Sequence, residues 1–149
     1  MEALKHKNQQ DPLFIAWKNR SVEFMKAYQD QSVKSMLANC SKDCQIAFNP
    51  LGQQGKGNVH EVGKAIWVSL IDSFPSLDNT INAVIKENDS IRCEVTIHGK
   101  QEKDFGDLKT KGHAFEEDHI FIFKMDDKGF INDISIYWNH ENFIKQLTA

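Results

Sequence analysis

The sequence has few cysteines, no excess of positive charge and no long apolar run. Its three cysteines are an odd number without a paired framework, which fits a reducing compartment. Its 18 basic residues do not outnumber its 21 acidic ones, whereas a dedicated nucleic-acid binder usually carries a basic excess. Its longest apolar runs are four or five residues, far below the roughly 20 that span a bilayer. We therefore expect a cytoplasmic protein that binds neither nucleic acid nor membrane.

Motifs for phosphate and metal binding are missing as well. The glycine-rich run at 52–57 lacks the third glycine of a dinucleotide-binding fingerprint, because His60 stands in its place. Cys40 and Cys44 have no second close pair of ligands, as a zinc site would need, so buried structural thiols are the better interpretation. We expect no metal and no cofactor.

Length and apolar periodicity predict a single α+β domain. A chain of 149 residues buries enough surface to fold as one unit. Residues 1–12 are expected to be a disordered lead without a signal-peptide core, and 13–149 to be the domain. Helices come first and strands follow, which predicts helices packed on one face of a curved antiparallel sheet. The spacing predicts helices near 14–28, 33–40, 58–74 and 140–147, and strands near 45–49, 81–85, 91–97, 113–125 and 130–139.

Two places carry residues suited to a binding or catalytic site. Alternation along the long strand puts His119 on the same face as Glu117, Phe121 and Phe123, where it could act as an acid or base. A histidine satisfied within the core is the alternative. The run at 137–140, Tyr-Trp-Asn-His, brings polar and aromatic groups to a strand end, as in many small-molecule pockets. A dimer or helix-packing patch would look the same.

Several positions follow a known family pattern: Gly99, the polar loop to Phe105, Gly112 before the long strand, Ile-x-Ile-Phe at 120–123 and the closing Gln146-Leu147. In these residues the chain resembles SnoaL-like polyketide cyclases and, more broadly, the nuclear transport factor 2-like and ketosteroid isomerase-like superfamily, over about 13–147. The resemblance implies a cone-shaped α+β barrel whose sheet wraps around the N-terminal helices. It also implies a deep apolar pocket at the wide end and homodimers that pair through the outer sheet face.

The catalytic residues of these families do not match this chain. The aspartate that SnoaL-like cyclases carry at the end of the last strand corresponds to Asn139, and an amide cannot shuttle a proton near neutral pH. The base aspartate of ketosteroid isomerases corresponds to Asn49, their oxyanion-binding acid to Phe121, and their oxyanion tyrosine falls near Val22. Neither parent activity is expected to transfer.

Three functions remain open. The first is a SnoaL-like domain that binds a small apolar or aromatic molecule in the cone. The second is an isomerase or cyclase with His119 as general base, assisted by Glu117 or Tyr137, whose activity tracks one ionisation near pH 6–7. The third is a dimeric protein-interaction module whose outer sheet face bears Ile91, Val95, Ile134 or Ile136.

The first function predicts a set of pocket residues. Asn49, His119 and Asn139 are expected to orient the ligand. The parity of the strand end leaves open whether Trp138 or Asn139 faces the pocket. The expected apolar lining comprises Trp17, Phe48, Trp67, Phe121, Phe123 and Tyr137, with Trp138 as the alternative to Asn139.

Overall fold

The structure is a computed structural model that describes residues 11–149; residues 1–10, most of the expected disordered lead, lie outside the described residues. Pro12 of the expected lead begins the first helix, α2 (Pro12–Gln29), and the side chain of Asp11 caps this helix by accepting a hydrogen bond from Leu13 N. Ser32 caps the short helix α3 (Val33–Ala38) in the same way. No helix among residues 11–149 is long and apolar enough to cross a membrane.

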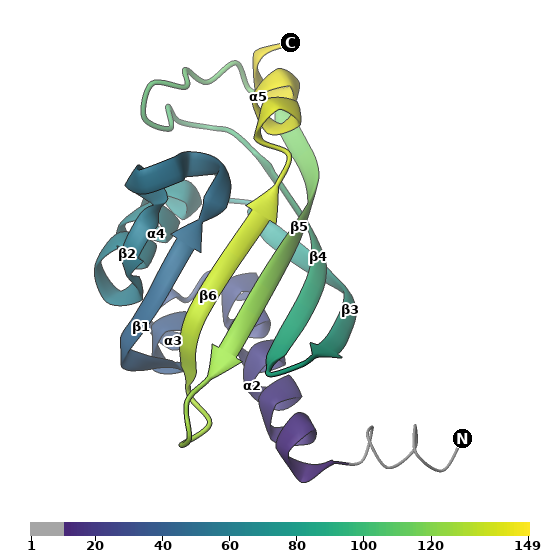
Figure 1. The fold of residues 1–149 in the computed structure, drawn as a ribbon. Coiled ribbons are helices and arrows are strands. Elements are labelled where there is room, and N and C mark those ends of the chain that lie inside the picture. Colours follow the sequence, from purple (N-terminus) through teal and green to yellow (C-terminus); the bar gives the residue numbers. More distant parts are fainter. Residues whose placement is uncertain (1–10) are drawn as a thin grey trace.

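Six strands form one curved sheet (Figure 1). Its order is β2-β1-β6-β5-β4-β3. The expected antiparallel meander is confirmed for β3 to β6, but β1 pairs in parallel with β6, so the sheet is mixed. A long crossover joins these two strands, as a parallel pair requires. The strands are β1 (Cys40–Phe48), β2 (Lys56–Asn58), β3 (Asp78–Glu87), β4 (Ser90–Lys100), β5 (Ala114–Met125) and β6 (Ile131–Trp138).

The crossover after β1 and the chain end supply the remaining helical elements. A 3₁₀ segment, η1 (Asn49–Gly55), follows β1, and a π turn, η2 (Val59–Gly63), leads into α4 (Lys64–Ser73). Asn58 caps this helical stretch, since its side chain accepts from His60 N. The last helix is α5 (His140–Thr148).

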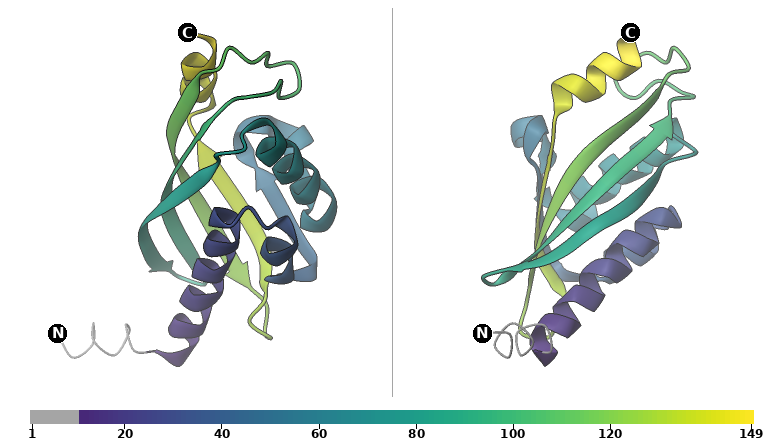
Figure 2. Two further views of the ribbon diagram at one scale, coloured as in Figure 1. Left: turned by 180° about the vertical axis from the view of Figure 1, so that it is seen from behind. Right: turned by 90° about the vertical axis from the view of Figure 1, so that its right-hand side faces the viewer.

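Helices α2, α3 and α4 lie on the same, concave side of the sheet (Figure 2). Phe24 of α2 joins the layers, because its ring lies 5.5 Å from Trp67 on α4 and 5.3 Å from Phe123 on β5, both edge-on. Cys40 and Cys44 are buried free thiols, as expected, and so is Cys93. The predicted cone-shaped α+β architecture is confirmed.

The residues expected on the outer sheet face are inside instead. Ile91, Val95, Ile134 and Ile136 are all buried in the core. In a sheet covered on one side only, the apolar set of an alternating strand faces the helices, and these residues follow that rule. The outer face carries the opposite parity, including Tyr137, which is 47% exposed.

Gly55 ends η1 at a point where no side chain fits. A Cβ atom there would lie 2.7 Å from the carbonyl oxygen of Phe48, which is backbone and cannot move aside. We expect Gly55→Ala to lower the free energy of unfolding by about 1–3 kcal/mol, the usual cost of overpacking. Urea unfolding would measure it, with the exposed neighbour Gln54→Ala as control; equal stability of the two variants would contradict the close approach.

Candidate functional site

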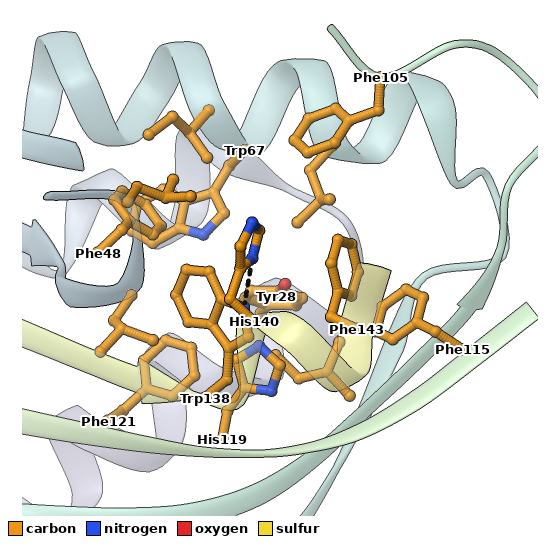
Figure 3. Close-up of a pocket in the computed structure, with 15 residues that line it drawn as sticks. Tyr28, Phe48, Trp67, Phe105, Phe115, His119, Phe121, Trp138, His140 and Phe143 are labelled. Carbon is orange, nitrogen blue, oxygen red and sulfur yellow. Dashed lines mark hydrogen bonds between the residues drawn. The ribbon is translucent and has the colours of Figure 1, made fainter. Parts of the chain in front are cut away.

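A cavity lined mainly by rings lies between the concave face of the sheet, helix α4 and helix α5 (Figure 3). About 60 Å³ of it is open to the centres of water molecules, several times the roughly 10–15 Å³ that one water needs. Five of the residues predicted to face the pocket do line it: Phe48, Trp67, His119, Phe121 and Trp138. Trp138 rather than Asn139 therefore faces inward.

Three of the predicted aromatic residues lie elsewhere. Trp17 packs half-buried against the core near the start of α2, and Phe123 is fully buried against Phe24. Tyr137 was expected in the pocket, but it points to the outer face because its neighbours on β6, Ile136 and Trp138, point inward. Its predicted catalytic role has no support from this position.

Two predicted polar residues have structural partners outside the cavity. The amide of Asn49 donates to the backbone oxygen of Ile136 at 3.2 Å and so ties β1 to β6. Asn139 caps α5, since its side-chain oxygen accepts from Asn142 N at 2.9 Å. Neither residue lines the cavity.

Glu117 holds helix α5 over the sheet. Its buried carboxylate accepts hydrogen bonds from the side chains of Asn142 at 2.6 Å and Gln146 at 3.2 Å. It does not line the cavity. It supports the helix that brings His140 and Phe143 to it.

We expect Glu117→Ala to loosen α5 and to lower the free energy of unfolding by about 1–3 kcal/mol, because hydrogen bonds to a charged acceptor are lost. Hydrogen exchange should speed up first at residues 140–148. Glu116→Ala removes a carboxylate from the exposed side of the same strand and serves as control. Unchanged exchange in α5 would contradict the anchoring role.

His119 is held as a neutral acceptor. Its ring stacks on Trp138 with 5.2 Å between centroids and 16° between planes. Its Nδ1 lies 3.0 Å from the backbone oxygen of Glu117, and because a carbonyl oxygen only accepts, Nδ1 must carry the hydrogen. The lone pair then sits on Nε2. Burial lowers the pKa of His119 to about 4, so the ionisation expected near pH 6–7 is displaced downward.

His140 has the opposite tautomer. The indole N–H of Trp138 donates to Nδ1 of His140 at 3.2 Å, so the hydrogen of the neutral ring is on Nε2. Phe143 stacks on the same ring with 5.8 Å between centroids. Trp138 therefore fixes two histidines, one through stacking and one through a hydrogen bond.

Tyr28 lines the cavity, although its position in the sequence does not predict this. It ends the buried stripe of α2, is 2% exposed and lines the cavity. Burial raises the pKa of its phenol, so the hydroxyl stays protonated and can donate. A hydroxyl-bearing ring at an inward helical position was the available signal. The other lining residues not predicted are Leu51, Ile66, Leu70, Ile97, Phe105, Phe115, Ile136, His140 and Phe143.

The cavity holds no carboxylate and no strong base. None of its lining residues is Asp, Glu, Lys or Arg. Within residues 11–149, no group of three or more His, Cys, Asp or Glu side chains converges as metal ligands would. The polar side chains that line the cavity are therefore neutral hydrogen-bonding groups, among them Tyr28, His119 and His140.

Solved structures share this architecture over most of the chain. A candidate SnoaL-like polyketide cyclase from Jannaschia sp. CCS1 is 16% identical, covers 94% of this chain and 96% of its own, and has a TM-score of 0.78. The chain has the SnoaL-like fold. A candidate polyketide cyclase from Pseudomonas putida KT2440 also shares the SnoaL-like fold, at 17% identity, with 89% of this chain and 98% of its own covered and a TM-score of 0.77.

A third structure with the SnoaL-like fold is TerC, co-crystallised with polyporic acid. It is 12% identical, covers 90% of this chain and 99% of its own, and has a TM-score of 0.72. No protein-family model and no curated protein matches the sequence. At these identities the likeness establishes the fold and leaves the activity to be argued from the site.

Proposed function

We propose that this SnoaL-like domain binds a small, largely aromatic molecule in its cavity. The observation that carries the proposal is the lining of the cavity. Ten of its fifteen residues have rings, and none is Asp, Glu, Lys or Arg. Such a surface favours a flat apolar ligand with few polar groups. The co-crystallisation of TerC with polyporic acid is a precedent for an organic ligand with this fold.

An isomerase or cyclase with His119 as general base is the second candidate. It is supported by the free Nε2 of His119 beside the cavity. A base with a pKa of about 4 takes a proton poorly at neutral pH, which favours hydrogen-bond acceptance over proton transfer. Binding therefore ranks above catalysis.

We also propose a homodimer, formed through the outer sheet face around Ile120, Ile122 and Tyr137. These side chains share the strand parity opposite to Phe121 and Ile136. Sedimentation of the parent protein and of Ile120→Lys would test it. A parent protein that is monomeric at micromolar concentration would contradict the dimer.

The binding proposal is tested with ethylbenzene, an uncharged ring without hydrogen-bonding groups. The protein has three tryptophans, so its indole N–H signals form a compact nuclear magnetic resonance readout. We expect saturable shifts of Trp67 and Trp138, which line the cavity, and none of Trp17, which lies outside it. Unmoved signals, or equal movement of Trp17, would overturn the proposal.

A cavity-filling variant on α4 gives a second test. Leu70 lines the cavity, whereas Val68 is 50% exposed on the same helix. Leu70→Phe should weaken ethylbenzene binding at least about tenfold by occupying its space. Val68→Phe adds the same ring outside and should bind like the parent protein. Equal affinities of the two variants would place the ligand elsewhere.

A further inference from the structure

Four side chains that line the cavity each keep one polar atom that has no hydrogen-bond partner within residues 11–149. Among the described residues, the only buried side-chain nitrogen or oxygen atoms without a hydrogen-bond partner are Nε of Arg92 and Oε1 of Gln101. Tyr28, Trp67, His119 and His140 each line the cavity and keep one polar atom unpaired, so these atoms are not sealed by protein. Figure 3 shows the four side chains around the same space. A ligand would meet them directly.

The hydrogen-bonding sense of these atoms is fixed by the contacts already described. The Tyr28 hydroxyl stays protonated, and the Trp67 indole N–H can only donate. Nε2 of His140 is a donor, because Nδ1 accepts from Trp138. Nε2 of His119 is the one obligate acceptor, because Nδ1 donates to the Glu117 carbonyl.

Charge restricts the ligand further. An anionic ligand would be buried without a Lys or Arg partner, and a cationic ligand without an Asp or Glu partner, since neither kind of residue lines the cavity. Burying an unpaired charge is costly. The ligand that fits is neutral.

We infer that Tyr28 and His119 determine which neutral ring compound binds, because each forms a hydrogen bond with one polar group of the ligand. The Tyr28 hydroxyl donates to a carbonyl-type oxygen of the ligand, and Nε2 of His119 accepts from a ligand hydroxyl or N–H. The Glu117 carbonyl keeps His119 in the accepting tautomer. This inference rests on the proposed binding function and adds the polar pattern of the ligand.

Four matched compounds test the pattern: ethylbenzene, acetophenone, 4-ethylphenol and 4-hydroxyacetophenone. They share one ring and differ in having neither group, the acceptor, the donor, or both. With the indole shifts as readout, acetophenone and 4-ethylphenol should each bind the parent protein about threefold to tenfold more tightly than ethylbenzene. The compound with both groups should bind most tightly.

The variants separate the two contacts. In Tyr28→Phe the affinity ratio of acetophenone to ethylbenzene should fall to about one, while the preference for 4-ethylphenol persists. In His119→Phe the preference for 4-ethylphenol should disappear and that for acetophenone persist. Tyr137→Phe and His98→Phe make the same chemical changes outside the cavity and should keep both ratios.

The same measurements separate ligand binding from the polar pattern of the ligand. If no compound shifts the indole N–H signals of Trp67 and Trp138, the proposed binding function is wrong. If ethylbenzene binds but the polar compounds bind no more tightly, only the polar pattern is wrong. This comparison needs only the parent protein, so it decides the question even where a variant does not fold. A ratio that survives Tyr28→Phe or His119→Phe overturns the role of that residue.

Discussion

Trp67→Ala is expected to lower the free energy of unfolding by about 3–5 kcal/mol, the range for removing a large buried ring. Trp67 is 1% exposed, and its ring packs edge-on against Phe24 and Phe48, each at 5.5 Å. It thereby joins α4 to α2 and to β1. The loss approaches the whole stability of many single domains, so the variant should be close to unfolding at room temperature.

Urea unfolding followed by circular dichroism measures this loss. Trp17→Ala removes the same side chain from a half-buried position at the edge of the core, and should cost clearly less. Equal losses would show that Trp67 is not a central packing residue. A loss below about 1 kcal/mol would show that the cavity walls close over the missing ring.

The stability of the protein is expected to fall as the pH decreases from about 6.5 to about 4, and His119 is the residue responsible. Its folded-state pKa of about 4 lies below the usual 6.5 because burial disfavours the charged ring. Between these values the unfolded chain binds a proton that the folded protein does not, so acid favours unfolding. The contribution is present above pH 6.5 and amounts to at most about 3 kcal/mol.

The surroundings of His119 support this direction. Tyr28 from α2 and His140 from α5 face it across the cavity without a negative charge. The hydrogen bond to the Glu117 carbonyl and the charge of Asp118 on its own strand raise its pKa, but burial lowers it by more. The test is the slope of unfolding free energy against pH, compared between the parent protein and His119→Phe. The variant should have the flatter curve between pH 4.5 and 6.5. Parallel curves would show that His119 protonates freely in the folded protein.

Strand alternation carried most of what could be predicted about the site. The parity of β5 placed His119 and Phe121 inward, and the structure confirms it. Alternation could not predict which side chain faces inward at the end of β6, because the strand ends at Trp138 and α5 begins two residues later. Only the register of β6 against β5, which pairs Trp138 with His119, decides the orientation.

Long-range features were beyond the sequence. The pairing of β1 with β6 links segments with no local signal for each other, and the exclusion of Trp17 and Phe123 from the cavity depends on where along the cone each ring lies. Tyr28 lies at the end of the helix predicted near 14–28, where the sequence does not distinguish it from other buried residues. Its role as a hydrogen-bond donor follows from the absence of a protein partner for its hydroxyl among the described residues, which requires the folded arrangement.

The parallel pairing of β1 with β6 also bears on how the chain folds. Asn49 and Ile136, bonded across this pair, are 87 residues apart, and closing so long a loop precedes any gain from the contact. Proteins dominated by such distant pairings fold slowly. During synthesis β1 is made well before β6, so the edge of β1 that pairs with β6 stays unpaired until residues 131–138 have been synthesised. A partly folded chain with this unpaired edge is the species most prone to aggregation, and the pairing of β6 with β1 removes that risk.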